Sequence, residues 1–269
     1  MMKIWAVSNQ KGGVGKTTTV VTLGGLLSSR DYRTLLVDLD PHGSLTSYFK
    51  MNPDDIERSV YDLFQNATKK IKNNNPKPFI VKTAIENLSV LPAATAIATL
   101  DRQISGLEGM GLVIANALAE VTEDYDFVLI DTPPMLGVLM INALAACEHL
   151  IIPVLAKFLA LKGLERMLHT IQMVFRSRKN PPSYTILPTM FDKRTRAAQE
   201  SLNKLTAEHS EYVKGGVIPT DTKLREASRA GVPGSFYAPN CKSVEAYTKL
   251  LESLIQDVPL NKKLHHESV

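Results

Sequence analysis

The chain has 269 residues, of which 44% are hydrophobic and 22% are charged, and its formal net charge is +4. This length and hydrophobic content predict a single α/β domain over residues 1–269, because no Gly/Ser/Pro-rich linker divides the sequence. Two cysteines are too few for a disulfide framework, and no apolar run reaches the roughly 18 residues of a membrane span. We expect a cytoplasmic protein, since the first residues lack a signal-peptide pattern.

The charge is distributed unevenly along the chain. Residues 1–156 contain 13 Lys/Arg and 16 Asp/Glu, a balance of −3, whereas residues 157–269 contain 18 and 11, a balance of +7. A basic half favours contact with nucleic acid or with an acidic partner. An ordinary solvated surface is the alternative, and charge alone does not decide between them.

Short apolar runs alternate with segments of helical periodicity. We predict strands at 3–8, 35–37, 88–91, 127–130, 149–153, 184–188 and 217–219, with helices at 17–29, 161–175, 197–208 and 243–255. This alternation indicates one doubly wound, mostly parallel sheet of seven to eight strands, flanked by helices on both faces. Two polar segments stand apart: 66–78, expected to be a surface insertion, and 259–269, expected to be a polar C-terminal tail.

Polar residues follow several of the predicted strands, namely Asn9, Asp38, Asp131 and Thr189. In open parallel sheets, ligands bind beyond the carboxyl ends of the strands. These side chains therefore mark the edge of the sheet where we expect the chemistry.

Residues 10–18 form a glycine-rich loop between a predicted strand and a predicted helix. The end of this loop, Gly15-Lys16-Thr17, fits the P-loop pattern Gly-x-x-x-x-Gly-Lys-Ser/Thr, although Gln10 occupies the first glycine position. Lys16 is expected to reach the β- and γ-phosphates and Thr17 to bind Mg²⁺, beside the positive end of the helix. The predicted nucleotide-binding residues of the loop are Gly12, Gly13, Val14, Gly15, Lys16, Thr17 and Thr18.

Three aspartates stand where a P-loop enzyme needs carboxylates. Asp131 ends an apolar strand and is expected to hold Mg²⁺ through water, as the Walker B residue does. Asp38 and Asp40 are two residues apart, on the same side of an extended chain, which suits orientation of a water at the γ-phosphate. Asp38 is also a candidate for a water-mediated contact with Mg²⁺. A turn-capping role is the alternative for each aspartate alone.

Several segments resemble the ParA/MinD family of deviant Walker A P-loop ATPases, and ParA more closely than MinD. The resemblance covers almost the whole chain through 11–18 (KGGVGKTT), 36–41 (LVDLDP), 130–134 (IDTPP), 188–195 (PTMFDKRT) and 217–219 (VIP). It implies a weak Mg²⁺-dependent ATPase that forms an ATP-sandwich homodimer, with ATP or ADP as its nucleotide. The partners that it implies are a second copy of the chain and a cargo adaptor or ATPase-stimulating protein.

The same resemblance implies roles for individual residues. Lys11 matches the signature lysine that reaches the nucleotide of the partner protomer, and Asp40 matches an aspartate required for hydrolysis. Asp38 matches the neighbour of that aspartate, which positions water. Lys11, Lys16, Asp38 and Asp40 are therefore the predicted catalytic residues. The segment that lines the adenine pocket in the family matches Thr189, Met190, Phe191 and Asp192.

ParA proteins bind DNA non-specifically through basic residues in the C-terminal half, and their motif after the Val-Ile-Pro segment usually carries two arginines. Here Thr220 replaces the first arginine and Lys223 takes the second place. This departure weakens the DNA hypothesis, and the form of the segment resembles ParA-like proteins called ParC, which position chemotaxis arrays at the cell pole. The candidate DNA or partner contacts are Arg194, Arg196, Lys223, Arg225, Arg229 and Lys242.

The sequence thus predicts an ATPase that cycles between monomer and dimer to position a cargo such as a chemotaxis array, with polar or nucleoid association. Two alternatives stay open: a plasmid or chromosome partition ATPase with a ParB-type partner, and a nucleotide-stabilised adaptor without a hydrolysis cycle. Membrane insertion of the MinD type is not expected, because the last helical segment has the pattern of a core-packing helix. Cys147 and Cys241 do not match the cluster ligands of a nitrogenase-reductase-like carrier. A kinase of the dethiobiotin synthetase kind is a minor alternative.

Overall fold

The computed structural model describes residues 1–71, 74–104, 106–176, 178 and 180–256. In this described part of the chain, a seven-stranded sheet lies at the centre with the strand order β3-β4-β2-β5-β1-β6-β7, and only β3 is antiparallel to its neighbour. The predicted doubly wound, mostly parallel sheet is therefore confirmed. The strands are β1 (Lys3–Val7), β2 (Thr34–Asp38), β3 (Val81–Lys82), β4 (Leu88–Leu91), β5 (Phe127–Asp131), β6 (His149–Leu155) and β7 (Ser183–Thr189).

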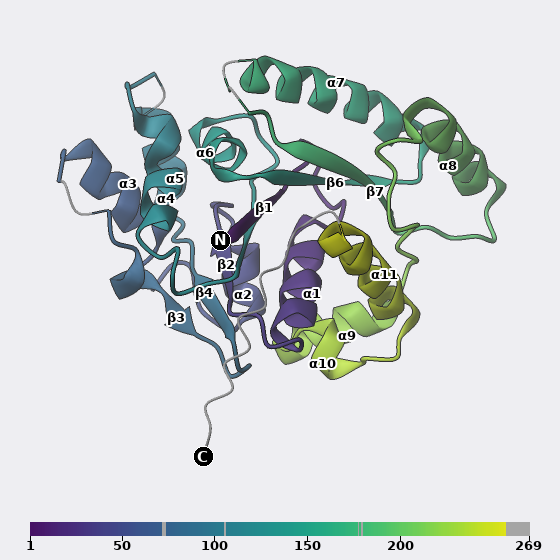
Figure 1. The fold of residues 1–269 in the computed structure, drawn as a ribbon, viewed down its shortest axis with the longest axis horizontal. Helices are drawn as coiled ribbons and strands as arrows, with labels where there is room; N and C mark the ends of the chain where they lie inside the picture. Colours follow the sequence, from purple (N-terminus) through teal and green to yellow (C-terminus); the bar gives the residue numbers. More distant parts are fainter. Residues whose placement is uncertain (72–73, 105, 177, 179, 257–269) are drawn as a thin grey trace.

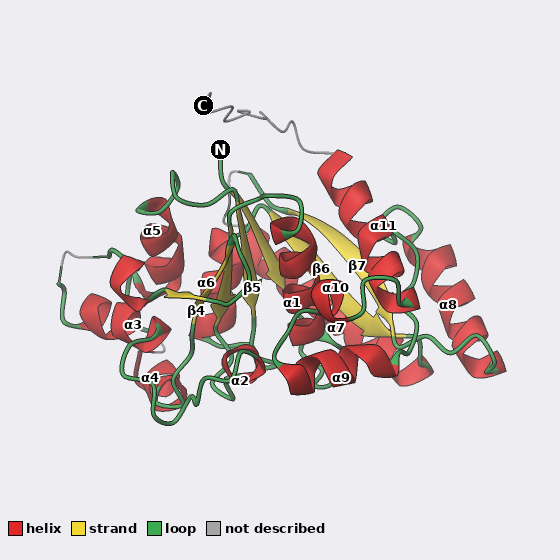
Figure 2. Cartoon of the chain, turned by 90° about the horizontal axis from the view of Figure 1, so that it is seen from below, coloured by secondary structure: helices red, strands yellow, loops and turns green. Residues whose placement is uncertain are grey.

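Helices cover both faces of the sheet (Figures 1 and 2). One face packs against α3 (Val60–Thr68), α4 (Ile97–Ile104), α5 (Val113–Ala119), α6 (Val138–Ala146), α7 (Phe158–Phe175) and α8 (Arg196–His209). The other face packs against α1 (Lys16–Ser28), α2 (Ser44–Tyr48), α9 (Thr222–Ala230) and α11 (Lys242–Gln256), with α10 (Gly234–Tyr237) beside α1. Two 3₁₀ turns, η1 (Lys77–Phe79) and η2 (Met110–Leu112), complete the elements.

Alternation along the strands divides the core in two. In β1, Ala6 belongs to the cluster under α3–α8, whereas Trp5 and Val7 belong to the cluster under α1 and α11. This is the period of two expected for a strand that is buried on both faces. Figure 1 shows the same division, with α6 and α7 on one side of the sheet and α1 and α11 on the other.

The predicted strand at 217–219 is wrong. Residues 217–219 form an isolated bridge, Phe191 with Pro219, and Ile218 N donates to the Pro188 carbonyl at 2.8 Å. They therefore run beside the end of β7 but are not a strand of the sheet. The seventh strand is instead β3, whose two residues are exposed at the edge of the sheet. A pair of exposed residues has neither the length nor the apolar run that identifies a strand in a sequence.

Two further expectations concern the ends of elements. Segment 66–78 begins in the last turn of α3 and ends in η1, directly before the edge strand β3. The expected tail at 259–269 lies outside the described residues. Helix α11 packs through Tyr247, Leu250 and Leu254, each at most 5% exposed, which confirms the prediction of a core-packing helix. Among the described residues, no helix has both the length and the apolar character needed to cross a bilayer.

Candidate nucleotide site

The loop between β1 and α1 has the backbone shape of an anion-binding turn. Gly13 and Gly15 adopt φ angles of 70° and 91°, a left-handed conformation that glycine reaches without steric strain. Gly15 is the N-cap of α1 and makes no side-chain capping bond. The first N–H groups of α1 therefore lack partners within the helix, and together with the helix dipole they favour an anion.

Hydrogen bonds fix this loop at both ends. Asn9 Nδ2 donates to the Pro153 carbonyl at 2.8 Å, and Asn9 Oδ1 accepts from the Lys11 backbone N–H at 2.8 Å. At the other end, the Thr189 hydroxyl donates to the Val14 carbonyl at 2.9 Å. The loop is thereby tied to β6 and β7, so its shape is set by the sheet. Thr189, predicted to bind nucleotide, is 2% exposed and lies behind the loop.

Neighbouring strands bring two carboxylates to the loop. Asp131 at the end of β5 is paired in register with Val7 of β1 and with Asp38 of β2. Asp131 Oδ2 accepts a hydrogen bond from Thr17 Oγ1 at 2.6 Å, so the hydroxyl and the carboxylate predicted for magnesium do come together. Lys16 is also buried here, at 8% exposure.

The electrostatics of this centre suit a divalent cation. Burial raises the pKa of Asp131 well above its usual value, and the nearby charge of Asp38 raises it further. Burial lowers the pKa of Lys16, while the charges of Asp131 and Asp40 act in the opposite direction. Asp131 Oδ1 is buried and has no hydrogen-bond partner within the described residues. An unpaired buried carboxylate oxygen beside a threonine hydroxyl fits Mg²⁺, which is bound through oxygen ligands and its own waters.

Asp38 organises the chain that follows β2. It is fully buried, and its carboxylate accepts hydrogen bonds from Asp40 N at 3.0 Å, Thr46 N at 2.8 Å and Thr46 Oγ1 at 2.7 Å. Burial raises its pKa to about 6, although the hydrogen bonds from Thr46 oppose that shift. With three bonds inside the chain, Asp38 fixes the loop from residue 38 to residue 46.

Asp40 lies on that fixed loop. Its Oδ1 accepts from the His42 backbone N–H at 3.0 Å and lies 2.9 Å from His42 Nδ1. The His42 side chain is 81% exposed. Asp40 Oδ2 makes no hydrogen bond within the described residues, so this oxygen remains available to a water or a ligand.

The two lysines of the loop lie in different surroundings. Lys16 is buried among the carboxylates, whereas Lys11 is exposed at the outer side of the loop. Within the described residues, Lys11 is held through its backbone N–H, by Asn9 Oδ1, and its side chain makes no hydrogen bond or ion pair. Lys16 can thus serve the site of its own chain, while Lys11 presents its charge to the surroundings.

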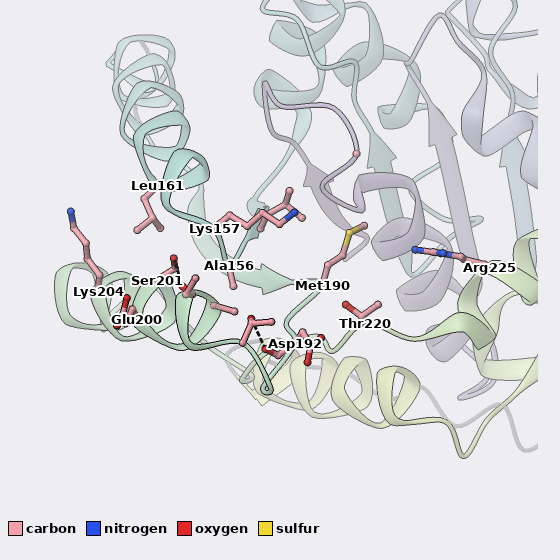
Figure 3. Close-up of a pocket in the computed structure, with 15 residues that line it drawn as sticks. Ala156, Lys157, Leu161, Met190, Asp192, Glu200, Ser201, Lys204, Thr220 and Arg225 are labelled. Carbon is pink, nitrogen blue, oxygen red and sulfur yellow. Dashed lines mark hydrogen bonds between the residues drawn. The ribbon is translucent and has the colours of Figure 1, made fainter.

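A cavity of about 980 Å³ opens beside the loop and extends to α7 and α8 (Figure 3). It brings together Gly13, Met190 and Asp192, three of the predicted nucleotide-binding residues. Met190 is 46% exposed with a φ of 50°, and a Cβ atom placed on Gly15 would lie 3.9 Å from its Cε. Phe191 is half-buried, and its backbone N–H donates to the Ile218 carbonyl at 3.0 Å.

The six basic residues predicted to contact DNA or a partner do not form one group of unpaired charges. Arg229 and Lys242 are exposed, while Arg225 lines the cavity beside the loop. Hydrogen bonds from Arg194 lower the pKa of Asp192 to about 2. Three of the six form ion pairs with nearby acids: Arg194 with Asp192 at 2.8 Å, Arg196 with Glu200 at 2.7 Å and Lys223 with Glu226 at 2.7 Å.

Sequence reasoning missed Thr46 and the full role of Asn9. Thr46 bonds Asp38 and also accepts from the Ala93 backbone N–H at 2.9 Å, which joins the loop after β2 to the end of β4. Nothing in its sequence context distinguishes this threonine from any other. Asn9 carries a usable signal, because an amide directly between a strand and a P-loop can bond both segments.

Comparison with known proteins agrees with this geometry. A protein-family model described as an AAA domain (AAA_31) matches residues 2–182. The chromosome-partitioning ATPase Soj of Thermus thermophilus is 38% identical over 257 residues, which cover 94% of this chain and 95% of that protein. The chromosome partitioning protein ParA of Myxococcus xanthus is 33% identical over 261 residues, covering 96% of this chain and 89% of that protein.

A solved structure shares both the fold and part of the sequence. Cobyrinic acid a,c-diamide synthase from Mycobacterium smegmatis, crystallised with an ATP analogue and magnesium, superimposes with a TM-score of 0.80. It is 31% identical, and the match covers 95% of each chain. With the phosphate loop, the paired carboxylates and these relatives taken together, the chain belongs to the ParA/Soj family of P-loop ATPases.

Proposed function

We propose that this protein is a partition ATPase, in which ATP closes a homodimer that binds DNA and hydrolysis reopens it. The observation that carries the proposal is the separation of the two loop lysines. Lys16 is buried with Asp131 and completes the site of its own chain, whereas Lys11 is exposed on the same loop. A charge in that position suits the nucleotide of a second protomer, as an arginine finger does when supplied in trans.

The residues around the loop would divide the work of the ATPase. Thr17 would bind Mg²⁺ directly, and Asp131 and Asp38 would hold its waters; the bound ion neutralises part of the charge on the phosphates. Lys16 and the N–H groups of α1 would bind the phosphates themselves. Asp40 would orient the attacking water through the oxygen that has no bond within the described residues. Asp38 would act on the same step by fixing the loop that carries Asp40.

The relatives described above favour partition over the positioning of chemotaxis arrays. One is named a chromosome-partitioning ATPase and another a chromosome partitioning protein. The array hypothesis rests on the loop at 188–196 and on the short stretch around Thr220, whose exposed side chain lies where ParA proteins usually have an arginine. We therefore propose DNA as the surface and a ParB-type protein as the stimulating partner. The basic half of the chain supports this choice through its balance of +7, from 18 Lys/Arg and 11 Asp/Glu.

The experiment is a DNA-binding titration of the Asp40→Ala protein with ATP, with ADP and without nucleotide, each across a salt series. We expect binding in ATP alone, with an affinity that falls steeply as salt rises, because contacts to the DNA backbone release counterions. Equal binding in all three states would contradict an ATP-controlled cycle and support a nucleotide-stabilised adaptor.

Absence of DNA binding in every state would contradict partition on DNA. If ATP still produced a dimer under those conditions, the anchoring surface would be a protein, as the array hypothesis requires. A sedimentation measurement on the same samples separates these outcomes.

A further inference from the structure

The cavity beside the phosphate loop is lined by Arg225, which was predicted as a candidate contact with DNA or a partner. Arg225 lies on α9, far from the loop in sequence, yet it lines the same cavity as Gly13 and Met190. Figure 3 shows the guanidinium of Arg225 and the amine of Lys157 extending toward Met190 from opposite sides. Arg225 makes no ion pair within the described residues, in contrast to Lys223 on the same helix, which is bound to Glu226.

The start of α9 is fixed in a way that directs Arg225 toward the loop. Asp221 caps the helix by accepting from Lys223 N at 2.9 Å, and it also accepts from Ser243 N at 3.3 Å. Arg225 follows within the next turn, and helical side chains lean toward the N-terminus of their helix. Here that direction leads toward the segment that carries Thr220, which lines the same cavity.

Backbone hydrogen bonds connect the segment that carries Met190 to the segment that leads into α9. Phe191 N donates to the Ile218 carbonyl at 3.0 Å, and Thr220 N donates to the Phe191 carbonyl at 3.2 Å. These backbone bonds hold the segment that leads into α9 against the segment that carries Met190. Met190 lies close to the loop, since its Cε is 3.9 Å from the position of a Cβ atom on Gly15, and it lines the same cavity as Gly13 and Arg225.

Resting on the proposed function, we propose that Arg225 is a nucleotide-binding residue that contacts the nucleoside end of ATP or ADP. The loop glycines bind phosphate, so the part of the ligand that reaches Met190 and Arg225 is the ribose and base. A planar guanidinium stacks on aromatic rings, and a thioether packs well at their edges, so these two side chains suit an adenine. Arg225 thereby belongs to nucleotide recognition and not to the DNA surface.

The test compares Arg225→Ala with the unaltered protein in titrations with Mg-ADP and, by competition, with Mg-pyrophosphate. We expect ADP to bind about tenfold more weakly, because stacking of a cation on a desolvated ring is of that order. Pyrophosphate, which has no nucleoside, is expected to bind both proteins equally. Arg176→Ala is the matched control, since it removes an exposed arginine at the end of α7 and leaves the cavity intact.

Unchanged ADP affinity, or an equal loss of ADP and pyrophosphate, would overturn the proposal. So would an Arg225→Ala protein that binds ADP normally but loses DNA at saturating ATP, because Arg225 would then belong to the DNA surface. Thermal unfolding without nucleotide checks that the variant is folded. If the unaltered protein bound no ADP at all, the proposed ATPase function itself would fail, which is a separate and distinguishable result.

Discussion

The phosphate loop and the exposed basic residues of the C-terminal half differ in how their polar groups are bonded. Around the loop, buried polar groups bond one another across strands, as Thr17 does with Asp131 and Thr189 with Val14. On the basic surface, exposed side chains pair with acids a few residues away, as Arg196 does with Glu200. A buried polar group needs a hydrogen-bond partner, so a buried group left without one indicates where a ligand binds. Exposed ion pairs contribute little to stability, so their positions do not indicate which partner the surface binds. The structure therefore indicates the nucleotide site more specifically than it indicates the surface that binds a macromolecular partner.

The largest expected effect comes from Lys16→Ala. Removal of a buried charge that faces the phosphates should lower ATP hydrolysis at least about 100-fold, the scale observed for loss of one preorganised group. Hydrolysis within tenfold of the unaltered protein would contradict the role of Lys16.

The next effect is on magnesium. Asp131→Asn removes the carboxylate whose Oδ1 has no partner within the described residues, so Mg²⁺ should lose most of its ability to strengthen ADP binding. We expect the ratio of ADP affinities in Mg²⁺ and in EDTA to fall by about 10- to 100-fold. Asp126→Asn, which alters an aspartate just before the same strand β5, is the matched control and should keep the full ratio.

A smaller effect tests how the loop is supported. Thr189→Val keeps the shape of the side chain but removes the hydrogen bond to the Val14 carbonyl, at a cost of about 1 kcal/mol. ADP and pyrophosphate should both bind about fivefold more weakly, since the loop that binds phosphate is loosened. A loss confined to ADP would instead indicate direct contact of Thr189 with the nucleoside.

The smallest effect concerns the exposed ion pair between Arg33 and Asp126, which lie just before strands β2 and β5, at the ends of these strands opposite to the phosphate loop. Burial alone would raise the pKa of Asp126, but hydrogen bonds from Arg33 lower it overall. A lowered pKa stabilises the fold above the unfolded value of about 3.9, and this contribution disappears as pH falls through the folded pKa. Because both side chains are more than a third exposed, Asp126→Asn should cost at most about 1 kcal/mol at pH 7. Once the pH is below the lowered pKa of Asp126 in the folded protein, the two proteins should unfold at the same denaturant concentration.

Much of the fold follows from the sequence because the strands are continuous apolar runs. Segments such as residues 127–130 are buried on both faces, so their pattern is visible without any knowledge of their neighbours. The predicted strand at 217–219 failed because its backbone bonds only the last residues of β7 and the turn around Phe191, at Pro188 and Phe191, which is too short a pairing to form a strand of the sheet. Strand β3 was not predicted because Val81 and Lys82 are both exposed and form no apolar run. They are a strand only through their pairing with β4.

The candidate site shows the same limit. The loop glycines and Lys16 directly follow strand β1, and Asp131 ends strand β5. Because parallel strands have their carboxyl ends on the same side of the sheet, these residues are expected to lie close together. The contacts of Thr46 with Asp38 and the direction of Arg225 depend on how separate segments pack, which single-sequence patterns do not contain. Basic composition indicated a charged half but not which arginines are paired, because pairing is decided by side-chain geometry.

The most direct test of the account is the assembly state of the Asp40→Ala protein, with and without the additional change Lys11→Ala. We predict that Mg-ATP converts the single variant from monomer to dimer in sedimentation velocity, whereas Mg-ADP does not. The double variant should bind ATP with similar affinity and stay monomeric, because the exposed lysine acts on the partner's nucleotide. Dimers of the double variant in ATP, or an equal loss of ATP binding and dimerisation, would contradict the proposed division of work between Lys11 and Lys16.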